Sequence, residues 1–285
     1  MTKETIRLGI STCPNDTFAF HGLLSGAVDC RGLTFEIELL DIQQLNDRLA
    51  EGAFAVAKTS FHKAIQLADT TVVLPSGSAL GFGVGPLLLA ATAESRPSSL
   101  AECTLCPGRD TTATLLFRLF YGDATRVEQV RFSEIMPRLT AKTADFGVCI
   151  HEGRFTWEQH GLSLVEDLGS RWEAETGTPL PLGGLVASRR LPPKTIATIQ
   201  DVIHDSLLVA RSDPAATLPT MRMYAQEFSD DVLMQHVDLY VNDWTLDLGD
   251  VGRHALATLS NRAAAIGIGT GRPLEVFAGE QEKRI

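Results

Sequence analysis

The chain has little positive charge for its length. Its 285 residues include 25 lysines and arginines against 35 acidic residues, which gives a formal net charge of −10. Nucleic acids and anionic membrane surfaces bind clustered Lys and Arg, so an acidic chain is not expected to have either as its main partner. A local basic pocket for a small anion is still compatible with this composition.

Cysteines are also few. Five cysteines are an odd number and do not form a disulfide framework in a chain of this size. Cys103 and Cys106 form a CxxC, but the residues between them are typical of a strand, in which positions i and i+3 point to opposite faces. His151-Glu152 lacks the second His of an HExxH motif, and no other His has metal-ligand spacing. We therefore expect no metal and no redox role.

The sequence has no long uninterrupted apolar run. Its most apolar window, residues 81–93, is broken by Gly and Pro and is too short to span a bilayer. The N-terminal residues MTKETIRLGIST show no basic segment followed by an apolar one, as a secretory signal would. A cytoplasmic enzyme or binding protein is expected. Because single cores rarely grow past about 250 residues, the chain is long enough for two domains.

The most informative stretch is residues 145–157, DFGVCIHEGRFTW. An apolar run, which predicts a short buried strand, ends at His151. Open α/β sheets bind their ligands at the carboxyl ends of strands, and an imidazole titrates near neutral pH. His151 is therefore a candidate general base. The alternative is a capping or core histidine that is hydrogen-bonded to a backbone carbonyl.

Three other predicted turns place polar side chains at the start of a helix. Asn15 follows the strand 6–12, Lys58-Thr59-Ser60 follows the strand 54–57, and Thr112 follows the apolar segment 104–107. The N-terminus of a helix is suited to binding anionic oxygens. The alternatives are ordinary helix caps and a solvated lysine. The third turn lacks the GxxxxGK[ST] motif, so nucleotide hydrolysis is not expected.

The order of the predicted elements indicates two lobes. Strands at 32–40, 71–75 and 83–91 and a helix at 41–51 fall in the first third. A short strand is predicted at 131–132, an irregular loop at 168–184, and helices from 192 onward. The chain is thus predicted to cross between lobes near residues 90 and 187. We expect an α/β protein whose lobe I is 1–90 with 187–285, whose inserted lobe II is 91–186, and whose ligand cleft lies between them.

Six motifs in order resemble one known family, the 1,4-dihydroxy-6-naphthoate synthases of the futalosine route to menaquinone. The motifs are CPNDTFAFHGLL, AKTSFHKA, GVGPLLLA, PGRDTTATLL, GVCIHEGRFTW and LGSRWEAETGTPLPLGG. The resemblance implies a type II periplasmic-binding-protein fold used as a lyase without a cofactor. Its small anionic substrate would be cyclic dehypoxanthine futalosine, split into 1,4-dihydroxy-6-naphthoate and dihydroxyacetone by a monomer or homodimer.

The resemblance also implies roles for individual residues. It makes His151 the base, and it gives substrate-binding positions at Lys58, Thr59, Ser60, Thr112 and Ala113, with Asn46 facing the ligand. Lys58 or Arg154 would pair with the aromatic carboxylate, although surface solvation is the ordinary state of either side chain. Asn46, on the predicted helix 41–51, is otherwise expected to be merely exposed.

Three other functions remain open. Chorismate dehydratase, an enzyme of the same fold and route, is the nearest. The second is a non-catalytic binding protein for a small carboxylate, which predicts a leader segment and a cleft histidine that tolerates replacement. The third is an effector-binding regulator, which would need a basic helix-turn-helix segment.

Overall fold

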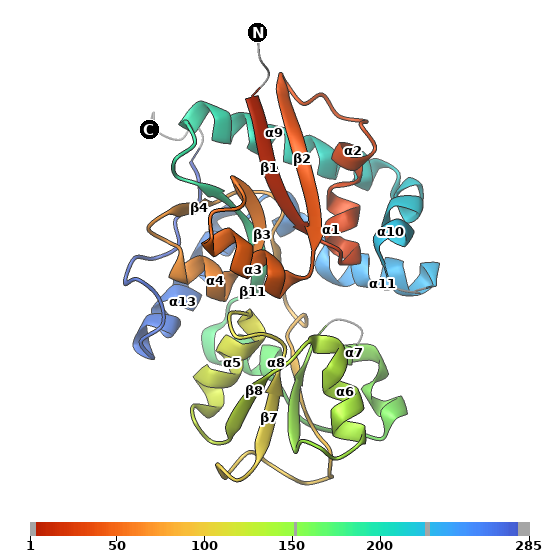
Figure 1. Cartoon of the computed structure of the whole chain (residues 1–285), viewed down its shortest axis with the longest axis vertical. Helices are drawn as coiled ribbons and strands as arrows, with labels where there is room; N and C mark the ends of the chain where they lie inside the picture. The colour runs from red at the N-terminus through yellow and green to blue at the C-terminus, as the bar shows by residue number, and fades with distance from the viewer. Residues whose placement is uncertain (1–3, 151–152, 226–228, 279–285) are drawn as a thin grey trace.

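The computed structural model describes residues 4–150, 153–225 and 229–278, and it contains two β-sheets, one in each half of the molecule (Figure 1). The first sheet has strand order β2-β1-β3-β11-β4, and β5 pairs with β11. Its six strands are β1 (Glu4–Ser11), β2 (Leu33–Leu40), β3 (Val56–Ser60), β4 (Thr71–Val73), β5 (Ala79–Gly81) and β11 (Leu180–Ser188).

The second sheet has strand order β10-β6-β9-β7-β8. Its strands are β6 (Leu87–Ala90), β7 (Cys103–Cys106), β8 (Arg126–Gln129), β9 (Phe146–Cys149) and β10 (Ser163–Asp167). Strands β7 and β9 lie in parallel at its centre and are buried along their whole length. The apolar run before His151 is therefore a buried strand, as predicted.

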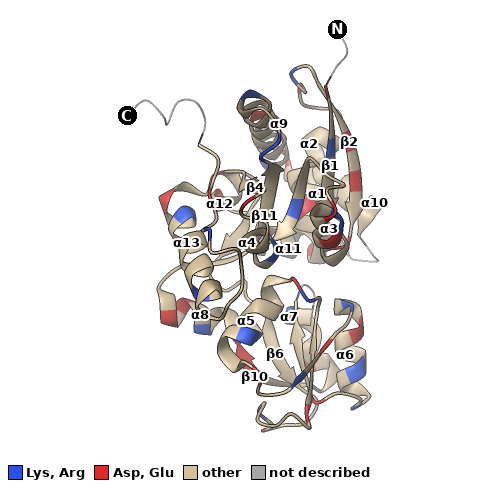
Figure 2. Cartoon of the chain, turned by 60° about the vertical axis from the view of Figure 1, so that its left-hand side comes forward, with Lys and Arg blue, Asp and Glu red and all other residues tan. Residues whose placement is uncertain are grey.

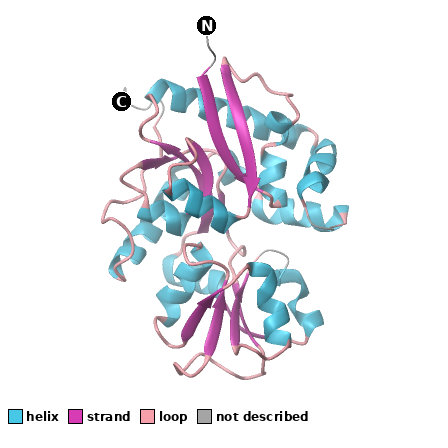
Figure 3. Cartoon of the chain, in the orientation of Figure 1, coloured by secondary structure: helices cyan, strands magenta, loops and turns pink. Residues whose placement is uncertain are grey.

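Helices cover the faces of both sheets (Figure 3). Around the first sheet lie α1 (Pro14–Ala19), α2 (His21–Leu24), α3 (Ile42–Ala50), α4 (Phe61–Gln66), α9 (Pro193–Ser212), α10 (Leu218–Tyr224), α11 (Asp230–Tyr240), α12 (Asp243–Leu246) and α13 (Gly249–Ala265). Around the second lie α5 (Thr112–Tyr121), α6 (Phe132–Thr140), α7 (Gly153–Thr156) and α8 (Leu168–Thr176). Two 3₁₀ turns span Trp157–His160 and Pro214–Thr217.

The longest of these helices shows why the predicted helical segment packs as it does. In α9, Ile196, Ile199 and Ile203 recur at helical spacing, so that one face of the helix is apolar. These side chains are buried in one core cluster with Leu8 and Ile10 of β1. The helix therefore closes one face of the first sheet.

Two segments predicted from sequence differ in the structure. Residues 168–184 form α8 and the start of β11 instead of an irregular loop. Asp167 caps α8, because its Oδ1 accepts from the backbone N–H groups of Gly169 (2.9 Å) and Ser170 (3.1 Å). The strand predicted at 131–132 is also wrong: the pairing strand is β8, at Arg126–Gln129, and Arg131 is the N-cap of α6.

The hydrogen bonding between strands bears on where the chain crosses between lobes. β6 pairs with β9 and β10 of the second sheet, whereas β11 pairs with β3 of the first. The expected limits, 1–90 with 187–285 and 91–186, would assign β6 to lobe I and divide β11. We propose instead that the crossings lie at residues 82–86 and 177–179.

The first crossing passes very close to α8. A Cβ added at Gly85 would lie 2.2 Å from the Cα of Gly169, and one added at Gly169 would lie 2.6 Å from the Cα of Gly85. Because contacts under 3.0 Å essentially never occur for a real Cβ, both positions need glycine for this backbone approach.

Charged residues of both signs lie on the outer helices, for example on α6 and α13 (Figure 2). Over residues 4–150, 153–225 and 229–278, no helix has both the length and the apolar character needed to cross a membrane.

Candidate functional site

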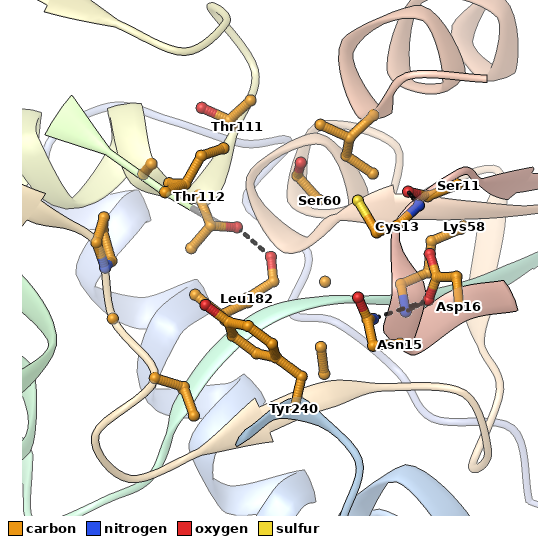
Figure 4. Close-up of a pocket in the computed structure, with 18 of the residues that line it drawn as sticks. Ser11, Cys13, Asn15, Asp16, Lys58, Ser60, Thr111, Thr112, Leu182 and Tyr240 are labelled. Carbon is orange, nitrogen blue, oxygen red and sulfur yellow. Dashed lines mark hydrogen bonds and ion pairs between the residues drawn. The ribbon is translucent and has the colours of Figure 1, made fainter. Parts of the chain in front are cut away.

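A pocket lies between the two lobes, with about 720 Å³ of empty space when its open mouth is included (Figure 4). Residues of the first lobe that line it are Ser11, Cys13, Asn15, Asp16, Ile42, Lys58, Ser60, Ala79, Leu182, Gly183, His236 and Tyr240. The second lobe contributes Thr111, Thr112, Ala113 and Ile150, and the first crossing contributes Val84, Gly85 and Pro86. The cleft expected between the lobes is therefore present.

Strand β3 presents two of the three residues of the Lys58-Thr59-Ser60 motif to the pocket. Lys58 and Ser60 line it, and Thr59 does not. Successive side chains of a strand point to opposite faces, so a strand cannot direct three in a row at one ligand. The Thr59 hydroxyl instead donates to Asn46 Oδ1 at 2.8 Å.

Asn46 is wholly buried and does not line the pocket, although it was expected either to face the ligand or to be exposed. Its Oδ1 accepts from the backbone N–H of Ser60 at 3.0 Å, and its Nδ2 donates to the Ser60 hydroxyl oxygen at 3.2 Å. Asn46 thus holds the end of β3 from outside the pocket and fixes the backbone and the hydroxyl group of Ser60.

The second wall is the start of α5. Thr111 is the N-cap, and its hydroxyl oxygen accepts from the backbone N–H of Thr114 at 3.3 Å. Thr112 and Ala113 follow in the first turn and line the pocket, and their contact with the substrate stays a prediction. The Thr112 hydroxyl donates to the Leu182 carbonyl oxygen at 2.5 Å, which connects the second lobe to β11 of the first (Figure 4).

The two cations considered for the substrate carboxylate are both engaged by protein groups. Lys58 Nζ donates to Asp16 Oδ1 at 2.6 Å and to the Gly77 carbonyl oxygen at 2.9 Å, and the two ionised side chains are 6% and 4% exposed. Arg154 does not line the pocket. It contacts the first crossing, where it donates to the carbonyl oxygens of Gly83 and Gly85, and it also pairs with Asp167 at 3.1 Å.

Three further pocket residues lie on one wall of the first lobe. His236 and Tyr240 come from α11, and Asn15 from α1. The Nε2 atom of His236 lies 3.2 Å from Asn15 Oδ1, and its ring centroid lies 4.7 Å from that of Tyr240. Asn15 was a candidate from its helix-start motif, but no sequence pattern indicated a role for His236 or Tyr240. A helical pattern shows that α11 has a buried face but not which cavity that face meets.

The predicted base, His151, lies outside the described residues, so its assignment stays a prediction. The residue before it, Ile150, follows directly on β9 and lines the pocket. Among the described residues there is no group of three or more His, Cys, Asp or Glu side chains that could hold a metal ion.

A polar contact joins the two lobes beside the pocket. Asp110, which directly precedes the α5 cap, accepts from Lys63 Nζ and from Gln66 Nε2 of α4, each at 3.1 Å. Burial alone would raise the pKa of Asp110, but the hydrogen bonds from Gln66 and Lys63 and the nearby positive charges outweigh burial and lower it. His62 of the same helix is buried with Nδ1 3.1 Å from the Thr111 carbonyl oxygen, and burial lowers its pKa.

Replacing Asp110 by Asn is expected to lower the free energy of unfolding at pH 7 by about 1.5–3 kcal/mol, as for other hydrogen bonds to charged groups. Because the folded pKa is depressed, this contribution is present above the unfolded pKa, about 3.9, and is lost as the pH falls through the lower folded value. Urea unfolding at pH 7 and at pH 3 measures it. Exposed Asp69→Asn is the control, and an equal loss for Asp110→Asn at both pH values would contradict the prediction.

Comparison with known proteins places the chain in a family. A family model described as menaquinone biosynthesis matches residues 6–265. A 1,4-dihydroxy-6-naphthoate synthase of Thermus thermophilus is 40% identical over 274 residues, which are 96% of this chain and 99% of that protein. One of Streptomyces coelicolor is 37% identical over 273 residues, 94% and 96% of the two chains.

Solved structures agree on the architecture. Protein AF1704 of Archaeoglobus fulgidus has a TM-score of 0.85 at 27% identity and covers 92% of this chain and 98% of its own. The periplasmic aliphatic sulphonate-binding protein SsuA of Escherichia coli has a TM-score of 0.65 at 12% identity over 100% and 97% of the chains, which shows the fold alone. The expected two-lobed periplasmic-binding-protein-like fold is confirmed. With its match over residues 6–265, the chain belongs to the menaquinone biosynthesis family.

Proposed function

We propose that this chain is a 1,4-dihydroxy-6-naphthoate synthase, the lyase that splits cyclic dehypoxanthine futalosine into 1,4-dihydroxy-6-naphthoate and dihydroxyacetone. The observation that carries the proposal is the sequence similarity, 40% and 37% identity over nearly the full length, to two proteins of that name. The pocket supports it, because Lys58, Ser60, Thr112 and Ala113 all line one cleft next to Ile150.

In the proposed reaction His151 removes a proton next to a carbonyl of the substrate. Its place in the chain supports this role, because the preceding residue lines the pocket. The carbon–carbon bond then breaks, and the electron pair is held as an enolate until it is protonated. A general base in this role contributes about 10²–10⁴-fold to the rate. Because the substrate divides into two products with nothing added, and one product is aromatic, the chemistry requires no redox cofactor.

The oxygens that become negative would be held by donors on both walls. Asn46 donates to the Ser60 oxygen, so the Ser60 hydrogen is expected to point toward the pocket. At the start of α5 the first backbone N–H groups have no partner within the helix, and the positive end of the helix dipole lies there. Each well-placed donor of this kind stabilises a transition state by roughly 3–4 kcal/mol.

The surroundings of the reaction are also part of the proposal. We propose that the chain acts in the cytoplasm as a monomer or homodimer on this small anionic substrate, without a metal, nucleic acid or membrane partner. Its formal net charge of −10 supports the last two points.

The direct test is to incubate the purified protein with cyclic dehypoxanthine futalosine and to follow the naphthoate and dihydroxyacetone, which should form in equal amounts. Chorismate is the control substrate, because chorismate dehydratase is the nearest alternative. Turnover of chorismate alone would contradict the proposal. Binding of cyclic dehypoxanthine futalosine with no product would favour a carboxylate-binding protein instead.

A further inference from the structure

A chain of hydrogen bonds runs along the first-lobe wall of the pocket from His236 to Lys58. His236 Nε2 lies 3.2 Å from Asn15 Oδ1, and Asn15 Nδ2 donates to Asp16 Oδ1 at 3.1 Å. Lys58 Nζ donates to the same carboxylate oxygen at 2.6 Å. All four side chains line the pocket, and Figure 4 shows Asn15 between the Lys58–Asp16 pair and Tyr240.

This chain determines which atom of each group donates. An ionised carboxylate only accepts hydrogen bonds, so the amide of Asn15 must direct its Nδ2 to Asp16 and its Oδ1 to His236. An amide oxygen also only accepts, and therefore Nε2 of His236 must carry a hydrogen. Tyr240, one turn later on α11, packs against the imidazole and restricts the plane of the ring.

The proposed reaction needs a proton donor as well as a base. His151 takes one proton from the substrate, and the electron pair of the broken carbon–carbon bond leaves with the dihydroxyacetone fragment as an enolate. Since the two products together contain every atom of the substrate, that enolate must take one proton back. Solvent then returns His151 and the proton donor to their starting states.

We propose that His236 is this proton donor, the general acid of the reaction. Asn15 orients the ring through Nε2, and the proton given to the enolate comes from the other ring nitrogen, Nδ1. One nitrogen held by a neighbour while the other exchanges the proton is the arrangement by which catalytic histidines are commonly kept in place. The inference rests on the proposed function.

Charged side chains also lie on the elements around His236. Helix α1 presents Asp16, one residue beyond the Asn15 contact, and β3 presents Lys58, which Asp16 neutralises. Strand β5, which also packs on α11, contributes the uncharged Ala79–Gly81. On α10, Arg222 pairs with Asp230 at the start of α11, two turns away from His236.

The test compares His236→Gln, His236→Ala and the exposed His254→Gln in the naphthoate assay. Glutamine keeps an N–H group for Asn15, so this variant is expected to fold with an unchanged thermal midpoint. We expect its kcat to fall about 10²-fold, at the low end for acid catalysis because water also donates protons, with KM within threefold. The wild-type kcat should fall as rising pH deprotonates His236, and this alkaline fall should be missing in His236→Gln. Added imidazole should restore part of the kcat of His236→Ala, and His254→Gln should match the wild type.

The experiment distinguishes a failure of the acid role of His236 from a failure of the proposed lyase function. A wild-type kcat in His236→Gln, a loss confined to KM, or an alkaline fall retained in that variant would overturn the acid role while leaving the lyase intact. A wild-type protein that forms no naphthoate would overturn the proposed function and this inference together.

Discussion

His151→Asn is expected to lower kcat for naphthoate formation by about 10³–10⁴-fold, the upper part of the range for a general base. Asparagine has a similar size and keeps hydrogen-bonding atoms, but it cannot accept a proton at neutral pH. The structure supports the assignment only through the chain neighbour Ile150, which lines the pocket. Steady-state kinetics with cyclic dehypoxanthine futalosine measure the loss, and substrate affinity should change much less than kcat.

His160→Asn is the matched control for this substitution, because His160 lies nine positions further along and is exposed. It should retain wild-type activity. Full activity of His151→Asn would remove the base assignment, while the synthase activity itself would stand on the wild-type assay.

Lys58→Met is expected to lower the free energy of unfolding by about 3–5 kcal/mol, because it leaves the buried carboxylate of Asp16 without its partner. The Gly77 carbonyl oxygen loses its donor as well. Urea denaturation at pH 7 measures the change.

The double variant Asp16→Asn with Lys58→Met removes both charges and should recover much of that loss. Lys194→Met, at an exposed position at the start of α9, is the control and should change stability little. A loss below about 1 kcal/mol for Lys58→Met would mean that the pair behaves like an exposed one.

The helices and strands that form the pocket could be predicted from local sequence patterns. The direction in which their side chains point could not always be predicted. The apolar run of β9 and the helix starts near residues 15, 60 and 112 are readable because each depends on neighbouring residues. Thr59 also obeys a local rule, since strand alternation directs it away from its neighbours. The contiguous Lys58-Thr59-Ser60 motif suggested that all three residues bind the substrate. Strand alternation instead predicts that Thr59 points away from the other two.

Other features depend on contacts between distant segments. His236 reaches the pocket only because α11 packs on α1, more than 200 residues earlier in the chain. Asn46 is buried because its amide bonds to the end of β3. The Pro and Gly residues of 168–184 indicated a loop, but Asp167 supplies a cap for α8, and Gly183 fits in β11 where an added Cβ would lie 2.7 Å from the Thr59 carbonyl oxygen.

The ion pair of Lys58 with Asp16 also bears on how fast a substrate arrives. The two charges of the pair cancel each other, while the whole chain carries −10. An anionic substrate is therefore repelled at long range. Dissolved salt screens this repulsion, with a Debye length of about 10 Å at 0.1 M. Moderate salt should raise kcat/KM for such a substrate, opposite to the behaviour of an enzyme that attracts its substrate with exposed cations.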